Sequence, residues 1–145
     1  MGRLNIPRGS RLYLDTAPII YSVEEHDVYW PELQPIWKAL GAGELQVVTS
    51  EISLLETLVH PIRYDNSELA DSYNELLTGG EVYLVPITAS VLRTAAEFRA
   101  HQNFKTPDAI HCATALLSGC EFLIANDTGF RRLKNIEVII LSDLF

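Results

Sequence analysis

The stretch "KTPDAIHCATALLSGCEFLIAND", residues 105–127, decides the fold because it contains one complete helix-then-strand unit. Thr106 and Pro107 favour the start of a helix, and Gly119 favours its end. The apolar run "EFLIA", residues 121–125, is typical of a short buried strand. The segment therefore predicts the repeating unit of an α/β protein.

The same alternation of strand and helix patterns extends through the rest of the chain. Strand patterns occur at residues 11–16, 44–50, 81–86, 121–125 and 137–141. Helical patterns occur at residues 17–25, 29–43, 51–61, 66–80, 88–101 and 106–119, the third ended by Pro61, and a short helical turn follows at 128–134. This order predicts an α/β fold, a three-layer α/β/α sandwich with a mostly parallel central sheet.

Length and composition indicate one globular domain. The chain has 145 residues, of which 48% are hydrophobic and 21% charged. We expect a single domain over residues 1–145, in which residues 1–10 form a non-native or flexible extension, because the first strand pattern starts only at Arg11. No apolar run approaches the roughly 18–20 residues of a membrane span, and the first residues lack the pattern of a secretory signal. We therefore expect a cytoplasmic protein that does not interact with membranes.

Cysteine and charge narrow the possible functions. Cys112 and Cys120 form no CxxC pair, and the four histidines are scattered, so reduced core thiols are expected. The net charge of −8 argues against a nucleic-acid partner, because phosphate binding needs basic residues. However, residues 1–72 hold five Lys or Arg against eleven acids, whereas residues 93–134 hold six against four. The basic residues thus gather around the opening stretch.

Acidic residues stand where elements meet one edge of the expected sheet. Asp15 closes the first strand, Asp127 follows the fourth, and Asp108 opens a helix. Binding sites in parallel sheets lie at the carboxyl ends of the strands, which all point to one edge. Glu56, about one and a half turns into the helix after the second strand, is the fourth candidate. Glu51 is its weaker rival, because a first-turn acid suits the helix dipole better.

Each of these acids also has a purely structural explanation. Asp15 and Asp127 are good helix caps or turn formers. In the series Thr106-Pro107-Asp108, the threonine suits the cap position and the acid suits the positive end of the helix dipole. Glu56 fits a capping box with Ser53, or a solvent-facing position. Taken singly, the structural explanations are at least as good, so only the joint pattern favours a site.

Four carboxylates at one edge would repel one another unless a cation joined them. Mg²⁺ and Mn²⁺ prefer carboxylate and water oxygens. Such ions bridge phosphate oxygens and activate water, which is how many nucleases cut without a covalent intermediate. The joint pattern therefore predicts a Mg²⁺ or Mn²⁺ site and hydrolysis of phosphodiester bonds.

From about Leu12 to the C-terminus, the chain resembles the PIN-domain ribonucleases, in particular the VapC-type toxins of bacterial toxin–antitoxin pairs. The motifs that carry this resemblance are "LYLDTAPIIY" (12–21), "TSEISLLETLV" (49–59), "KTPDAIHCATAL" (105–116) and "FLIANDTGFRRL" (122–133). The last two place their acids 19 residues apart, with a helix and a strand between them, and that spacing is quite specific.

The resemblance implies a Mg²⁺- or Mn²⁺-dependent endoribonuclease that is the toxin of such a pair. The metal-binding acids of the family would correspond to Asp15, Glu56, Asp108 and Asp127. RNA becomes the expected substrate, and the residues that could hold its backbone are Arg93, Arg99, Lys105, Arg131, Arg132 and Lys134. We expect at least half of these to be solvated surface charges instead.

The resemblance also implies a homodimer and a cognate antitoxin. The apolar stretch "VYWPELQPIWKAL", with Trp30, Ile36 and Trp37, could supply an antitoxin groove or a dimer surface, and ordinary core is an equal alternative.

One position departs from the family pattern. A Thr or Ser usually stands two residues before the fourth acid, and Ala125 occupies that position here. Asn126 is a candidate replacement, although a continuing strand would turn its side chain away. His111 lies three residues after Asp108, on the same face of the helix. We expect it to support a carboxylate by packing or hydrogen bonding rather than to act as a catalyst.

Other functions remain open at this stage. A catalytically weak PIN-like binding or assembly module is favoured by Ala125 and by the acidic balance. A phosphotransfer enzyme with an aspartate nucleophile is weakened because "DTAP", residues 15–18, lacks the DxD spacing of haloacid-dehalogenase-like sites. A nucleotide-binding protein is weaker still, because neither GxGxxG nor GxxxxGK[ST] occurs.

Overall fold

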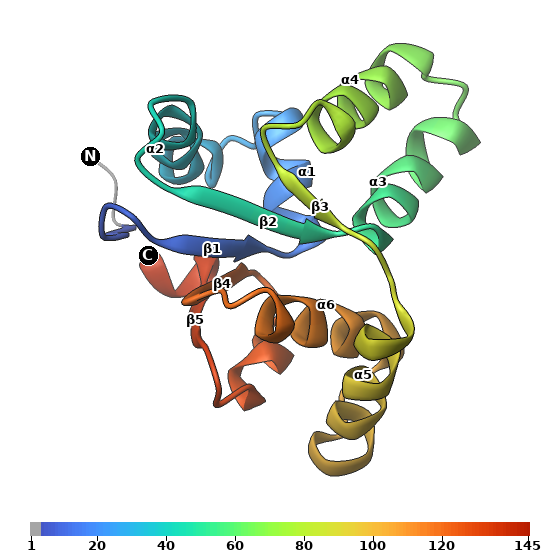
Figure 1. Ribbon diagram of the computed structural model, residues 1–145. Coiled ribbons are helices and arrows are strands. Elements are labelled where there is room, and N and C mark those ends of the chain that lie inside the picture. Colours follow the sequence, from blue (N-terminus) through green and yellow to red (C-terminus); the bar gives the residue numbers. More distant parts are fainter. Residues whose placement is uncertain (1–3) are drawn as a thin grey trace.

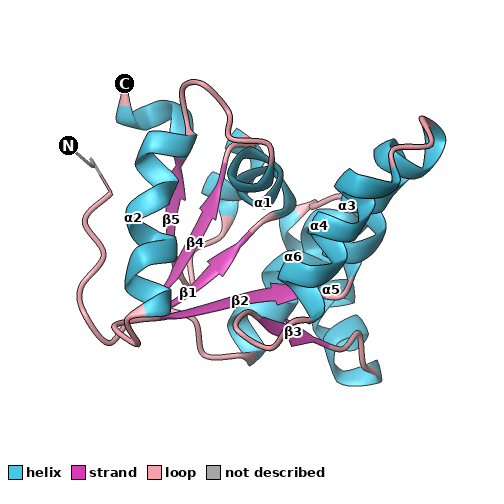
Figure 2. Cartoon of the chain, turned by 90° about the horizontal axis from the view of Figure 1, so that it is seen from above, coloured by secondary structure: helices cyan, strands magenta, loops and turns pink. Residues whose placement is uncertain are grey.

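The computed structural model describes residues 4–145, which contain five strands and six α-helices (Figures 1 and 2). The strands are β1 (Arg11–Leu14), β2 (Gln46–Ser50), β3 (Tyr83–Val85), β4 (Phe122–Ala125) and β5 (Glu137–Ile140). The helices are α1 (Thr16–Val23), α2 (Trp30–Gly41), α3 (Ile52–Arg63), α4 (Ser67–Thr78), α5 (Ala89–Gln102) and α6 (Thr106–Leu117), with the 3₁₀ turns η1 (Thr128–Arg132) and η2 (Leu141–Leu144). Within the described residues, no helix is long and apolar enough to cross a membrane.

The strands form one parallel sheet in the order β3-β2-β1-β4-β5. β1 lies at its centre, where Tyr13 is in register with Val48 of β2 and Leu123 of β4. The chain builds outward from β1 to β3 and then returns to place β4 on the other side of β1. The strand order therefore reverses beside β1, and in open α/β sheets such a point is where ligands bind.

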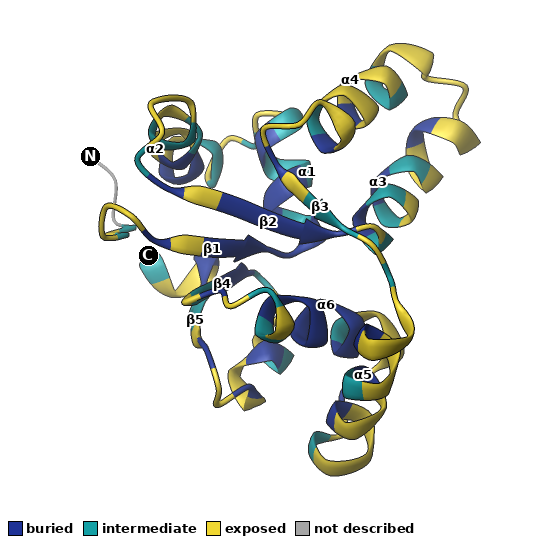
Figure 3. Cartoon of the chain, in the orientation of Figure 1, coloured by how far each residue is buried: buried dark blue, intermediate teal, exposed yellow. Residues whose placement is uncertain are grey.

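Alternate residues of β1 belong to two different cores, because successive strand side chains point to opposite faces. Leu12 and Leu14 pack with buried residues of α1, α2 and α4, whereas Tyr13 packs with those of α5 and α6. Figures 1 and 3 show helices on both sides of the sheet, with α5 and α6 opposite α1 to α4. Both faces are covered, which confirms the predicted α/β/α sandwich and explains the unbroken apolar strands.

Two helix boundaries differ from the expectation. α3 does not end at Pro61 but continues to Arg63. A proline removes one backbone hydrogen bond, but Pro61 is buried, and its packing keeps the helix intact. The chain leaves α3 only at Asp65, where φ is 51°. The cap of α6 is Lys105 rather than Thr106, whose hydroxyl accepts a hydrogen bond from Arg99 instead.

Residues 4–10 lie against the domain. Leu4 and Ile6 pack on the core beneath α1, α2 and α4. The Gly9 amide donates to the Glu44 carbonyl at 2.7 Å, and Ser10 is buried. We expected a non-native or flexible extension over residues 1–10. Residues 1–3 lie outside the described residues, and that expectation stays a prediction.

Candidate functional site

The ends of the elements bring the predicted acids to the carboxyl edge of the sheet. Asp15 follows β1 and is the N-cap residue of α1. Asp108 lies in the first turn of α6, and Asp127 follows β4 as the N-cap residue of η1. Glu56 lies inside α3, the helix that follows β2. Because the strands all run in the same direction, Asp15, Asp127 and the start of α3 lie at one edge, and His111 brings α6 to the same edge through its contacts with Asp15 and Glu56.

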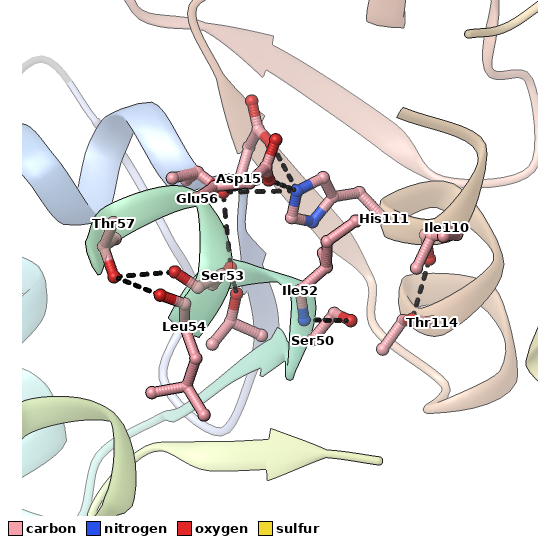
Figure 4. A network of polar contacts seen from close by, with 12 residues as sticks. Asp15, Ser50, Ile52, Ser53, Leu54, Glu56, Thr57, Ile110, His111 and Thr114 are labelled. Carbon is pink, nitrogen blue, oxygen red and sulfur yellow. Dashed lines mark hydrogen bonds and ion pairs between the residues drawn. The ribbon is translucent and has the colours of Figure 1, made fainter. Parts of the chain in front are cut away.

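His111 lies between Asp15 and Glu56, and Figure 4 shows the three side chains turned toward one another. Its Nε2 is 2.8 Å from Glu56 Oε1 and 3.2 Å from Asp15 Oδ1, and the residue is 1% exposed. Burial lowers the pKa of His111, but the hydrogen bond to Glu56 and the charges of Asp15, Glu56 and Asp108 outweigh burial and raise it. His111 therefore bridges two acids that would otherwise repel each other.

Asp15 and Glu56 have opposite pKa shifts. Burial raises the pKa of Asp15 to about 6, with His111 and the Thr16 amide acting against it and the charges of Asp108 and Glu56 adding to it. Burial also raises the pKa of Glu56, but hydrogen bonds from His111 and Thr16 outweigh it, so the net shift is downward. The Thr16 hydroxyl donates to Glu56 Oε1 at 2.7 Å. The environment thus keeps Glu56 ionised and makes the charge on Asp15 costly.

Asp108 and Asp127 also interact. Burial is the largest cause that raises the pKa of Asp108, and the charge of Asp127 comes next, while His111 and Lys105 act in the opposite direction. Asp127 is exposed, and its Oδ1 accepts a hydrogen bond from the Gly129 amide at 2.8 Å. The turn-forming role suggested by the sequence is therefore present. It does not remove the carboxylate from the site, because the charge of Asp127 still acts on Asp108.

The acids suit a hard divalent cation in kind, although they do not form a ready-made ligand cluster. Within residues 4–145, no group of three or more His, Cys, Asp or Glu side chains is arranged to hold a metal ion. All the acids offer carboxylate oxygen, which Mg²⁺ and Mn²⁺ prefer. The pKa values of Asp15 and Asp108 are raised in part by neighbouring acids, so a cation among them would relieve repulsion. The residues therefore fit such an ion.

Hydroxyl residues near the acids were missed by sequence reasoning. Ser53 is fully buried, and its hydroxyl lies 2.7 Å from that of Thr49, which donates to the Leu14 carbonyl at 2.9 Å. Ser53 therefore does not form the suggested capping box with Glu56. The Tyr13 hydroxyl lies 2.5 Å from His111 Nδ1. For Thr49 and Ser53, the only signal in the sequence was the run of hydroxyl residues in "TSEIS", residues 49–53. That run is equally typical of a helix start.

Two other candidates have partners away from the acids. Asn126 donates from Nδ2 to the Tyr21 hydroxyl at 3.2 Å and accepts at Oδ1 from the Ser142 amide at 2.9 Å. It thus ties η2 to α1. Glu51, the rival of Glu56, is the N-cap residue of α3 and accepts at Oε1 from the Ile87 amide at 3.0 Å. These contacts give Asn126 and Glu51 a structural role.

The six basic candidates fall into two groups. Three have partners within the protein: Arg99 donates to Thr106, Arg131 pairs with Asp143 at 2.6 Å, and Arg132 lies 4.7 Å from the centre of the Phe104 ring. Lys105 joins this first group, because it is the N-cap residue of α6 and its charge acts to lower the pKa of Asp108. The side chains of Arg93 and Lys134 are exposed and form no hydrogen bond or ion pair with any residue between 4 and 145, so they are the freest to contact a phosphate backbone.

The chain belongs to the PIN domain family, whose sequence pattern it matches over residues 12–136. The expected family is thereby confirmed. No curated protein matches the chain.

Solved structures of toxins share the fold. VapC20 from Mycobacterium tuberculosis, a sarcin–ricin loop cleaving toxin, is 21% identical with a TM-score of 0.71, over 88% of this chain and 98% of that one. VapBC2 from Rickettsia felis, bound to a promoter DNA fragment, is 17% identical with a TM-score of 0.70, over 90% and 98%. A toxin–antitoxin complex from Klebsiella pneumoniae is 23% identical with a TM-score of 0.66, over 88% and 95%. Similarity at this level shows the fold alone.

Proposed function

We propose that this protein is a Mg²⁺- or Mn²⁺-dependent endoribonuclease, and that it acts in the cytoplasm as the toxin of a toxin–antitoxin pair. The observation that supports this most directly is the coupling of the acids: Asp15 is buried, and its pKa is raised to about 6 by burial and, in part, by neighbouring carboxylates. Such a group gains most from a bound cation. Membership of the PIN domain family and the likeness to VapC20, a sarcin–ricin loop cleaving toxin, support RNA as the substrate.

Each acid has a role in this proposal. Asp15, Asp108 and Asp127 would hold the ion, with Glu56 completing the site. When bound, the ion would supply Lewis-acid activation of the phosphodiester. Glu56, which His111 and Thr16 keep ionised, would orient the attacking water through its carboxylate.

A second candidate is a PIN-like binding or assembly module with little catalytic activity. It is favoured by one specific observation: Ala125 provides no hydroxyl before Asp127, and the side chain of Asn126 is bound to Tyr21 and Ser142. The two functions differ in whether RNA is cut, so one experiment separates them.

The test is cleavage of total cellular RNA and of purified structured RNAs with Mg²⁺, Mn²⁺ or a chelator. Asp108→Asn removes one proposed ligand, and Asp71→Asn, an exposed acid on α4, is the matched control. Cleavage that needs the metal, persists in Asp71→Asn and disappears in Asp108→Asn would support the nuclease. Folded wild-type protein that cuts no RNA and is not stabilised by Mn²⁺ would overturn it in favour of the binding module.

The partner surfaces can also be proposed. The exposed face of α3 carries Leu55, Val59 and Ile62, which are 64%, 43% and 66% exposed and lie on one side of the helix. We assign this stripe to the homodimer. For Ile36, the alternative of ordinary core holds, because it is 3% exposed.

A hollow of about 330 Å³ is a candidate groove for the antitoxin. It is lined by Ser22, Val23, Trp30, Trp37, Ser72 and Leu76. The two tryptophans are partly exposed, and Trp37 Nε1 donates to the Ser22 hydroxyl at 2.8 Å, which holds one ring in place. The similar structure from Klebsiella pneumoniae is a toxin–antitoxin complex, which supports an antitoxin as the occupant.

A further inference from the structure

Tyr13 reaches the site from the interior of the sheet. It lies on β1 two residues before Asp15 and is 0% exposed. Its hydroxyl oxygen is 2.5 Å from His111 Nδ1 and accepts a hydrogen bond from the Ser50 amide at 3.1 Å. The two rings meet edge to face, with centroids 5.6 Å apart and an interplanar angle of 70°. A core tyrosine thus contacts the histidine that bridges Asp15 and Glu56.

These contacts determine which histidine nitrogen carries the proton. A tyrosine hydroxyl has one proton, and an amide N–H can only donate. The Ser50 amide therefore uses an acceptor position of the hydroxyl oxygen, and the hydroxyl proton is free to point at His111 Nδ1. When Nδ1 accepts, the proton of the neutral ring is on Nε2. That nitrogen is the one that faces Glu56 Oε1 and Asp15 Oδ1.

We propose that Tyr13 is a positioning residue of the nuclease site, because its hydroxyl keeps the Nε2–H of His111 directed at both Asp15 and Glu56. The opposite tautomer would turn a nitrogen lone pair toward two carboxylates, and the two acids would lose their shared donor. The spacing of the first two acids therefore depends on a hydroxyl that contacts neither of them. The importance of this spacing for catalysis rests on the proposed function, but the tautomer can be measured without any activity.

No other described group can take over this task. Tyr13 is the one hydrogen-bond partner of Nδ1 within residues 4–145. The Thr16 hydroxyl proton points at Glu56, and the Thr49 hydroxyl proton points at the Leu14 carbonyl. Loss of the Tyr13 hydroxyl would therefore leave Nδ1 buried without a partner and would remove one of the two sets of contacts that keep the ring proton on Nε2.

The direct test is ¹⁵N NMR of the histidine rings in the metal-free protein, at a pH where the imidazole is neutral, with His111 assigned by comparison with His111→Gln. In wild type we expect a protonated Nε2 and a bare Nδ1. In Tyr13→Phe we expect a mixture of tautomers and an affinity for Mn²⁺ that is roughly tenfold weaker, the range found for partners of metal ligands. Tyr73→Phe is the matched control, because Tyr73 is also buried and hydrogen-bonded, but to Glu24.

The results separate this inference from the proposed function. A proton on Nδ1 in wild type would overturn the positioning role, and that measurement does not depend on the behaviour of Tyr13→Phe. The role would also be overturned if Tyr13→Phe kept the wild-type tautomer and the Mn²⁺ affinity of Tyr73→Phe. If wild type neither bound Mn²⁺ nor cut RNA, the proposed function would fail, while the tautomer would still decide whether Tyr13 directs His111.

Discussion

Asp15 Oδ1 lies 3.2 Å from Nε2 of His111, and this contact does not fully compensate for the burial of the carboxylate. Burial is the largest influence on Asp15 and raises its pKa from 3.8 to about 6. The folded protein therefore binds this proton more tightly than the unfolded chain does. The stability that follows is fully present below about pH 4 and is lost as the pH rises through about 6.

Asp15→Asn should therefore stabilise the metal-free protein at neutral and alkaline pH. A shift of about two pKa units corresponds to at most about 3 kcal/mol in the free energy of unfolding at pH 8, and the difference should shrink toward zero near pH 4. Urea unfolding with a chelator at several pH values between about 4 and 8 measures it. A difference that does not depend on pH would contradict the shift, and Asp71→Asn supplies the flat reference.

Divalent metal should offset this difference in stability. Binding to the folded state stabilises it by about 2.7 kcal/mol when the free ion is at a hundred times its dissociation constant. Mn²⁺ should therefore raise the melting temperature of wild type but not of Asp15→Asn or Asp108→Asn. Equal increases in all three proteins would indicate binding elsewhere on the acidic surface.

Gly129 tests the position of Asp127. A Cβ at Gly129 would lie 3.1 Å from Asp127 Oδ1, so the carboxylate in Gly129→Ala has to move by a few tenths of an ångström. A displacement of about 1 Å can cost about a hundredfold in rate, so we expect a smaller loss of RNA cleavage with little loss of stability. Gly41→Ala is the control, because a Cβ there meets nothing within 4 Å. Equal cleavage rates in Gly129→Ala and Gly41→Ala would show that the turn from Asp127 to Gly129 does not determine the position of the Asp127 carboxylate.

The two groups of basic residues should respond differently. Arg93→Ala should weaken RNA binding and reduce the slope of log affinity against log salt by about one, without changing stability. Arg132 lies over Phe104 and donates to the Gly129 carbonyl at 3.1 Å, so Arg132→Ala should also lower the free energy of unfolding by about 1–2 kcal/mol. Filter binding over a salt series and urea unfolding measure the two effects. Lys38→Ala, on α2, is the control. If Arg93→Ala and Lys38→Ala had the same salt slope, Arg93 would not belong to the RNA-binding surface.

The stripe on α3 gives a prediction about assembly. Ile62→Glu places a charge on the most exposed apolar residue of the proposed dimer surface and should yield a monomer. Sedimentation at micromolar concentration measures this, with Leu92→Glu as a control at an apolar residue that is 50% exposed and lies on α5. A wild-type protein that is already monomeric would exclude the dimer.

Much of the fold could be predicted because its elements are marked locally. Gly119 and the apolar run after it define the turn from α6 to β4, and such signals do not depend on distant residues. Pro61 was misleading, because its effect depends on the packing of the ring and not on its sequence neighbours.

The site was predictable only in part. The acids could be found because they follow strand ends, but the roles of Tyr13 and Ser53 depend on contacts across the sheet. The Tyr13 hydroxyl meets a residue 98 positions away in the sequence, and no local pattern contains that information.

The place of β4 beside β1 has a consequence for synthesis of the protein. β1 and β2 are complete early in translation, but one edge of β1 stays open until residues 122–125 have left the ribosome. Asp127, the last proposed ligand, emerges later still. On the proposed chemistry, the set of acids is incomplete until the end of synthesis, so we expect a product that terminates before Phe122 to be inactive.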